Sequence, residues 1–264
     1  MSKKTQQDST RGLQQTRGVD SARRVLQILL DFSENRPDVT IEEVAQKYGL
    51  SAPSAYRYMA LLRELYLVEE RSRGRYVLAP QVLRLAAAAE RSFDLGRVAR
   101  PYLDRLREET NETALVVKRI RDGAVCLAVS QPDKSFSYSF LPGHIMALHR
   151  GAVAKALLAK MPGRDRETYL GKVQPPLKAD EMARIKADLA KINETGLAES
   201  ESEVDPGVWA VASPIIVSGH TLGAVSVVAP SFHVDDQLRK TMRDRVQVAA
   251  VDISNAIALT GEQT

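Results

Sequence analysis

The sequence predicts an α+β fold in two parts, a winged helix-turn-helix followed by a larger domain built around an antiparallel sheet. The first part is indicated by two short helical patterns that meet at Gly49 and by a basic hairpin pattern at 66–79. The second part holds two hairpin patterns, with turns at 122–123 and 218–219, and helical periodicity before and after them. Helices that bracket antiparallel hairpins are typical of an α+β domain.

Composition favours a globular protein of the cytoplasm. Of the 264 residues, 44% are hydrophobic and 27% charged, which is ordinary for a globular chain. No apolar run approaches the ~20 residues that span a bilayer, and the polar start is unlike a secretory signal. The single cysteine, Cys126, excludes a disulfide framework and a multi-thiolate metal cluster, and it fits a reducing compartment.

Positive charge gathers in the first third of the chain. The net charge is +4, and residues 1–80 hold thirteen Lys or Arg against ten Asp or Glu, a local net charge of +3. Contact with a polyanion needs such an excess, although +3 over this length is also ordinary variation. Residues 1–18 are polar and mildly basic, and we expect them to form a disordered arm.

Helix-capping signals organise the first domain, which is predicted over 19–80. Asp20 is the expected N-cap of a helix whose apolar residues recur at helical spacing as far as Phe32. Thr40 and Glu43 then have the T-x-x-E spacing of a capping box, in which each side chain accepts from a free backbone N–H. This pattern predicts a second, short helix.

The third helix is the predicted DNA-reading element. Ser51 caps it, and Pro53 is tolerated in its first turn, where amides have no intrahelical partner. Its inward face is predicted to hold Ala55, Met59, Leu62 and either Leu65 or Tyr66. Its outward face would then lie in the major groove, with an arginine on guanine and the wing arginines on the backbone or the minor groove. The DNA-binding candidates are Ser51, Ser54, Tyr56, Arg57, Tyr58, Arg71, Arg73 and Arg75.

The second domain is predicted over 96–264, after an alanine-rich linker helix at 81–95. A helix at 99–111 with Pro101 near its start is expected first, followed by the hairpin that turns at 122–123. A further strand at 136–143 and the second hairpin complete the sheet. The other helices are expected at 151–161, 180–193 and 235–259.

Several other classes of function have little support. The chain has no G-x-S-x-G, P-loop or G-x-G-x-x-G motif, so an enzyme is not predicted. The four histidines lack paired ligand spacing, so we expect neither a metal site nor a cofactor. Cys126 lies within an apolar strand, which favours an inert thiol over a redox sensor. Two alternatives stay open: a winged helix that docks protein, and a second domain that drives assembly.

At this point the chain resembles the IclR family of transcription regulators, from about Val19 to Ile257. The similar stretches occur in the family's order, although no single one is specific. They are SARRVLQIL at 21–29, TIEEVAQKYGLSAPSAYRYMALLRELYLVEE at 40–70, RYVLAP at 75–80, VLRLAAAAE at 82–90, LHRGAVAKALLA at 148–159, NETGLAESESEVDPGVWAVASPI at 193–215 and LGAVSVVAP at 222–230.

The resemblance implies a GAF-like effector-binding domain and a homodimer paired through its N-terminal domains, often as a dimer of dimers. It also implies a double-stranded DNA operator, and an organic-acid or aromatic effector of a catabolic pathway. Neither the effector nor the operator is specified by the sequence, and repression and activation stay open.

The resemblance also implies an effector pocket between the sheet and the helix that Gly151 opens. The free amides and dipole of that helix end can bind a carboxylate without a charged side chain. Glu203 would accept from a ligand hydroxyl or pair with Arg150, and Trp209 would cap an aromatic ligand or lie in the core. The candidates are Met146, Leu148, His149, Gly151, Ala152, Glu203, Trp209, Val211, Ser213 and Ser226.

The chain departs from the family at Leu148-His149-Arg150, where small or hydroxyl residues are common. Two basic side chains beside the pocket favour an anionic ligand. The alternative is that Arg150 faces solvent and His149 packs locally.

Overall fold

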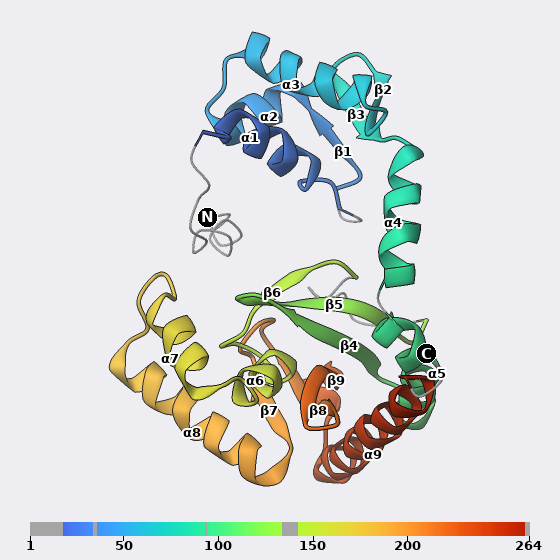
Figure 1. Cartoon of the computed structure of the whole chain (residues 1–264), viewed down its shortest axis with the longest axis vertical. Coiled ribbons are helices and arrows are strands. Elements are labelled where there is room, and N and C mark those ends of the chain that lie inside the picture. The colour runs from blue at the N-terminus through green and yellow to red at the C-terminus, as the bar shows by residue number, and fades with distance from the viewer. Residues whose placement is uncertain (1–17, 34–35, 93, 134–141, 262–264) are drawn as a thin grey trace. The chain divides into compact units, whose positions relative to one another are not determined.

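A computed structural model describes residues 18–33, 36–92, 94–133 and 142–261 of the chain (Figure 1). The expected basic arm over 1–18 lies outside the described residues, apart from Gly18. The chain divides into two compact units between residues 92 and 93, and each is described by itself below.

The N-terminal unit has the predicted order of a winged helix-turn-helix. Its three strands form an antiparallel sheet in the order β1-β3-β2, of which β1 was not predicted. The elements are α1 (Asp20–Leu29), β1 (Asp38–Thr40), α2 (Ile41–Tyr48), α3 (Ala52–Glu64), β2 (Val68–Ser72), β3 (Arg75–Leu78) and a final helix α4 (Gln81–Ser92).

Local capping explains where α2 begins and ends. The Glu43 amide donates to Thr40 Oγ1 at 3.2 Å, and the Thr40 amide donates to Glu43 Oε2 at 2.9 Å, which confirms the capping box. Gly49 ends α2 in the left-handed region, with φ of 62°. The prediction for α1 was wrong by one residue: Val19 is its N-cap, and Asp20 instead binds Arg23 at 2.6 Å.

The inward face of α3 is confirmed except at its end. Ala55, Met59 and Leu62 are buried in the core of the unit. Leu65 and Tyr66, one of which was expected to continue this face, are 53% and 74% exposed. The reason is that the helix ends at Glu64, and Tyr66 turns the chain away with a φ of 56°.

The C-terminal unit is a six-stranded antiparallel sheet in the order β6-β5-β4-β9-β8-β7. The strand expected over 136–143 lies almost wholly outside the described residues. The strands are β4 (Thr113–Ile120), β5 (Gly123–Ser130), β6 (Ile145–Ala147), β7 (Ala198–Glu201), β8 (Val208–Val217) and β9 (His220–Pro230). The helices are α5 (Asp94–Thr110), α6 (Ala152–Ala159), α7 (Gly163–Gly171), α8 (Ala179–Thr195) and α9 (Asp236–Gly261), with a short 3-10 turn at Ser231–His233.

The boundary between the linker and the second domain differs from the prediction. The linker helix was expected to end at 95 and the next helix to begin at 99, but α4 ends at Ser92 and α5 already runs from Asp94. Gly96 lies inside α5 and does not end a helix. It packs closely on β5, since a Cβ at this position would come 3.3 Å from Leu127 Cβ. The glycine therefore marks a close contact between helix and strand.

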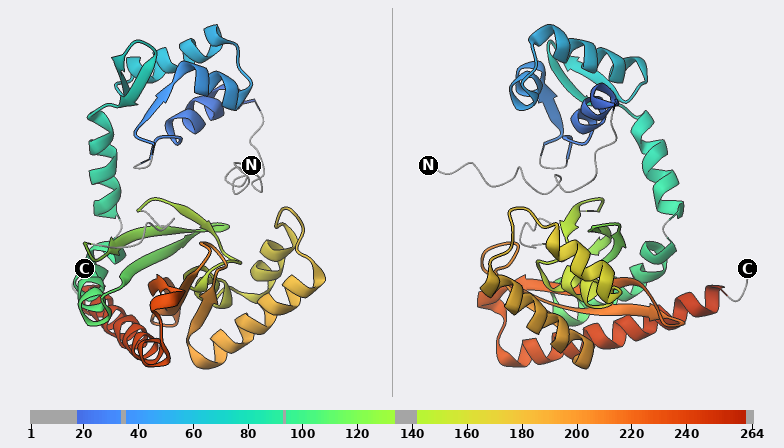
Figure 2. Two further views of the ribbon diagram at one scale, coloured as in Figure 1. Left: turned by 180° about the vertical axis from the view of Figure 1, so that it is seen from behind. Right: turned by 60° about the vertical axis from the view of Figure 1, so that its left-hand side comes forward.

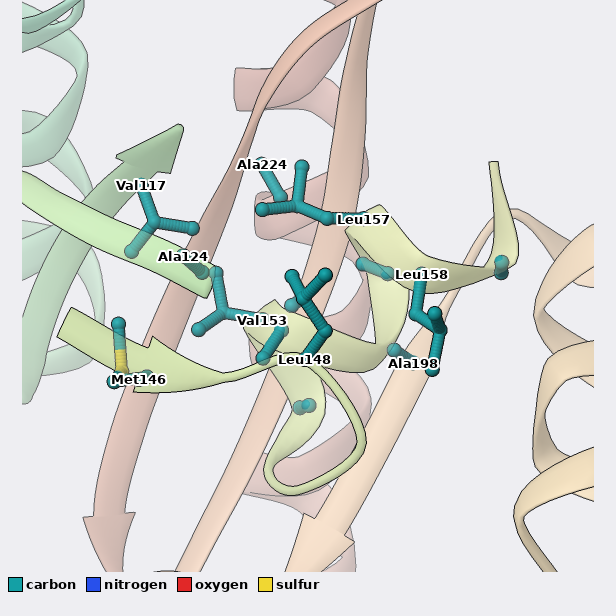
Figure 3. Packing of buried hydrophobic residues seen from close by; sticks show 14 of the residues in the cluster. Val117, Ala124, Met146, Leu148, Val153, Leu157, Leu158, Ala198 and Ala224 are labelled. Carbon is teal, nitrogen blue, oxygen red and sulfur yellow. The ribbon is translucent and has the colours of Figure 1, made fainter. Parts of the chain in front are cut away.

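Helices cover both faces of the sheet. On one face α6, α7 and α8 bury a core with β4, β5, β8 and β9, and Figure 3 shows Leu148, Val153 and Leu157 within it. On the other face α5 and α9 bury a second core (Figures 1 and 2). Helix α9 also reaches the edge strand, where Arg243 binds both carboxylate oxygens of Glu199, at 3.1 and 2.8 Å.

We predict that Gly223→Ala in β9 lowers the free energy of unfolding by about 2 kcal/mol through overpacking. A Cβ there would lie 2.5 Å from Leu95 Cδ2 and 2.6 Å from the Val117 carbonyl oxygen. Denaturant unfolding followed by the fluorescence of Trp209, the single tryptophan, measures this unit. Gly171→Ala is the control, since nothing lies within 4 Å of its new Cβ. Equal stability of the two variants would contradict the prediction.

Candidate functional site

The outward face of α3 presents a short chain of polar groups. Tyr56 and Arg57 are exposed, and Ser54 is half-buried. Ser51 accepts from the Ser54 amide at 3.4 Å and donates to Ser54 Oγ at 3.0 Å, and Arg57 Nη2 donates to the same oxygen at 3.3 Å. These bonds hold the guanidinium beside the helix N-terminus and leave it further donors for a base edge or a phosphate.

Tyr58 is placed differently from the other α3 candidates. It is half-buried and packs against the core of the N-terminal unit. Only part of its side chain therefore faces outward.

The wing arginines fall into two kinds. Arg75 donates to Asp38 Oδ2 at 2.8 Å, and this hydrogen bond raises the pKa of the guanidinium. Arg71 and Arg73 are exposed at the tip, and in the described part of the chain neither has a carboxylate partner. A phosphate would meet two uncompensated charges at this tip, not three.

The second site is a small cavity beside the start of α6. Five of the predicted effector residues line it: Met146, Gly151, Ala152, Glu203 and Ser226. Its free volume is about 20 Å³, close to the space that one water molecule needs. The other lining residues are Leu115, Arg150, Val153, Ser200, Val204, Asp205, Val208, Ala210 and Val228.

The first amides of α6 already have partners, which corrects the expectation that they are free. The Gly151 amide donates to Glu203 Oε2, and the Ala152 amide donates to Ser200 Oγ, both at 2.9 Å. Gly151 makes this turn with φ of 82°, in the region that favours glycine. A carboxylate is thus bound at the predicted anion site, and it belongs to the protein.

Lys155 completes the site, although sequence reasoning missed it. The side chain is buried in α6, and Nζ donates to Asp188 Oδ2 and to Glu203 Oε1, both at 2.6 Å. Glu203 was expected to meet a ligand hydroxyl or Arg150, and its ionic partner is instead Lys155. A signal was available, because a lysine within the apolar run AVAKALLA must bind a carboxylate if it is buried.

Three effector candidates lie on the face of the sheet opposite the cavity. Trp209 and Val211 belong to the core beneath α5 and α9, and Ser213 follows them at strand spacing. The cavity is lined instead by Val208 and Ala210. Because successive side chains of a strand point to opposite faces, an error of one residue exchanges the two sets.

These three residues have structural contacts where they lie. Trp209 packs beneath Arg239, whose guanidinium carbon is 5.1 Å from the ring centroid. Ser213 Oγ donates to the Gly196 carbonyl at 3.1 Å and so binds the end of α8. Trp209 therefore lies in the core, which is one of the two positions that the sequence left open for it.

Leu148 and His149 also lie outside the cavity lining. Leu148 is fully buried, and its amide donates to the Tyr169 hydroxyl at 2.8 Å. His149 Nδ1 lies 2.7 Å from the same hydroxyl, and burial together with the charge of Arg150 lowers the pKa of His149. His149 packs locally, as one of the two alternatives held, while Arg150 is exposed at the cavity rim.

Other candidate chemistry is not supported. Cys126 is buried, and burial raises the pKa of its thiol to about 12, so a reactive thiolate is disfavoured. In the described ranges, no group of three or more His, Cys, Asp or Glu side chains is placed to hold a metal ion. No helix among the described residues is long and apolar enough to cross a membrane.

Comparison with known families matches both parts of the chain. The family model of the bacterial transcriptional regulator IclR C-terminal domain matches residues 87–255, and that of the IclR helix-turn-helix domain matches residues 21–72. The transcriptional regulator BhcR of Paracoccus denitrificans is 28% identical to this chain, over 94% of this chain and 90% of its own length.

Two solved structures have the same fold. The Thermotoga maritima IclR structure has a TM-score of 0.71 at 23% identity and covers 91% of this chain and 99% of its own. An IclR homologue from Microbacterium hydrocarbonoxydans, complexed with 4-hydroxybenzoate, has a TM-score of 0.74 at 20% identity. That likeness covers 89% of this chain and 98% of the homologue.

We predict that part of the protein's acid sensitivity comes from His149. Burial and the nearby charge of Arg150 lower the pKa of the folded His149, whose Nδ1 lies 2.7 Å from the Tyr169 hydroxyl. An unfolded histidine titrates near pH 6.5. This stabilisation is therefore complete above about pH 6.5 and is lost as the pH falls below it.

The measurement is the free energy of unfolding at pH 8 and pH 5. Wild type should lose up to about 1 kcal/mol more than His149→Gln between these two pH values. Equal losses in the two proteins would rule out this role for His149.

Proposed function

The chain belongs to the IclR family of bacterial transcription regulators, and we propose from this premise that it binds a DNA operator through α3 and the wing and responds to an organic acid. Its relatives are regulators and not enzymes. Because its proposed partner is chromosomal DNA, its proposed site of action is the cytoplasm.

The operator proposal rests above all on the exposed Arg57 at the capped start of α3. Its guanidinium can bond two acceptors of guanine in the major groove, while Ser51 and Ser54 bond phosphates near the same helix end. Arg71 and Arg73 then bind the backbone from the tip of the wing, where they have no carboxylate partner in the described chain. We assign Arg75 a lesser role because Asp38 neutralises it.

The effector proposal rests on the cavity beside α6. A helix-end amide, a buried ammonium and the exposed Arg150 favour an anionic ligand. The Microbacterium homologue binds a carboxylate, 4-hydroxybenzoate, within the same fold. We propose an organic acid for this chain as well, from a pathway whose operon the protein regulates.

We further propose that the active unit is a homodimer, with pairs of dimers as the larger assembly. Large apolar side chains are exposed on α1 and α4: Leu26 is 58% exposed, Leu83 71% and Leu85 59%. A partner surface is what such side chains need. An effector would then modulate operator binding in proportion to its preference for one arrangement of the dimer.

We predict that Arg57→Ala weakens binding to a selected operator by about 1–3 kcal/mol and relaxes base preference. Arg73→Ala should weaken binding to all DNA sequences alike, and it should reduce the slope of log K against log salt concentration by about 1. Sites selected by wild type from random DNA provide the probe, and fluorescence anisotropy measures affinity. The control is Arg184→Ala, at an exposed arginine of α8 paired with Asp180. If Arg57→Ala kept wild-type sequence preference, the assigned recognition face would be wrong.

We also predict that one class of acid stabilises the full-length protein. A ligand at ~100 times its Kd adds about 2.7 kcal/mol to the free energy of unfolding. The screen compares 2-oxo acids, benzoate and 4-hydroxybenzoate with their neutral amides by thermal shift, followed by operator release. Stabilisation by acids and not by amides is expected. A folded protein that responds to none of them would favour an assembly role for the second domain.

A further inference from the structure

The effector cavity contains a bound carboxylate that the chain itself supplies. Glu203 Oε2 accepts from the Gly151 amide at 2.9 Å, and Glu203 Oε1 accepts from the buried Lys155 at 2.6 Å. A helix-end amide and an ammonium are the two groups that an organic acid would need at this place. The anion site is therefore built, and it is filled from within.

The space left in the cavity is too small for an organic acid. The free volume is about 20 Å³, which holds about one water molecule. Val204 closes the site over the helix start, because a Cβ built on Gly151 would lie 3.0 Å from Val204 Cγ2. An acid can therefore bind the Gly151 amide and Lys155 only if Glu203 withdraws from them.

The charges of the site favour exchange over addition. Lys155 carries one positive charge, and its two partners Asp188 and Glu203 carry two negative charges between them. Arg150 and Asp205 at the cavity add one charge of each sign, so these five groups together carry one negative charge. A third carboxylate in the same closed site would add like-charge repulsion. Replacement of Glu203 by the acid keeps the charge of the site unchanged.

Of the two carboxylates on Lys155, Glu203 is the one placed to move. Asp188 belongs to the helix α8, whereas Glu203 lies in the loop between β7 and β8. Hydrogen bonds hold that loop: the Gly207 amide donates to Ser202 Oγ at 3.0 Å, the Ser202 amide to the Val208 carbonyl at 2.8 Å, the Val208 amide to the Asp205 carbonyl at 3.3 Å and the Ser231 amide to the Gly207 carbonyl at 2.7 Å. Withdrawal of Glu203 therefore requires a loop to shift, whereas withdrawal of Asp188 requires a helix to shift.

The remaining lining indicates what else the acid carries. Leu115, Val208 and Val228 offer an apolar wall. An acid with an apolar body suits this wall.

We infer that Glu203 is a resident competitor at the effector site, which an incoming monocarboxylate with an apolar body displaces from Gly151 and Lys155 as the 202–207 loop opens. This inference rests on the proposed effector function. It assigns Glu203 a role opposite to that of a ligand-binding residue, because its removal should strengthen the binding of acids.

The test measures the affinity of benzoate, 4-hydroxybenzoate and pyruvate, and of benzamide, for three full-length proteins by calorimetry. Glu203→Gln should bind an acid about tenfold more tightly than wild type, the change expected when one competing charge-assisted hydrogen bond is lost. The affinity for benzamide should be the same in Glu203→Gln as in wild type. Asp188→Asn removes the same charge from Lys155 without freeing Gly151, so its gain should be clearly smaller.

Hydrogen exchange on wild type provides a second readout that does not depend on a variant. A saturating acid should speed exchange of the amides in 202–207, including Gly207, and slow exchange at the start of α6. Slower exchange in the loop would overturn the inference.

The outcomes separate the two proposals. Acid binding to wild type that weakens in Glu203→Gln would overturn the exchange and leave the effector function standing. An equal gain of acid affinity in Glu203→Gln and Asp188→Asn would show that only the lost charge matters, and it would also overturn the exchange. Absence of acid binding in all three proteins would remove the acid effector, and this inference with it.

Discussion

The C-terminal unit is organised around the need to neutralise one buried ammonium. Lys155 lies in a helix whose eight residues are all buried, and an uncompensated charge there would cost several kcal/mol. Its two carboxylates come from α8 and from the loop after β7, so a single charge ties three separate segments together. The cavity lies at this junction, and aliphatic and aromatic side chains fill much of the rest of the layer.

The helix ends of the N-terminal unit depend on shorter-range bonds. Its α2 is bounded by contacts between residues a few positions apart, and the start of α3 is held by Ser51 in the same manner. Such local bonds position the outward face of α3 relative to its own core, whatever happens in the second unit. The proposed DNA-reading helix is thus held by local caps, and the proposed effector cavity by a long-range ionic junction.

This difference also explains what could be predicted. The capping box of Thr40 and Glu43 spans four residues, so its pattern is visible in the sequence and was confirmed. The bond from Gly151 to Glu203 spans 52 residues, and nothing local reveals that the amide is occupied. The α+β class and the hairpins followed from the sequence pattern, but the face of β8 to which Trp209 points did not. Both faces of β8 are buried, so its residues do not alternate between apolar and polar, and only the pairing with neighbouring strands shows which side chains face the cavity.

The edge of the sheet has a consequence for how copies of the protein can meet. The outer strand β7 has only four residues, and Glu199 and Glu201 on it are engaged by Arg243 and Arg239 of α9. A short, charged edge clamped by a helix is a poor template for another chain's strand. The β7 edge therefore does not favour continuation of the sheet into another copy of the chain. The same clamp guards this edge against strand-to-strand aggregation.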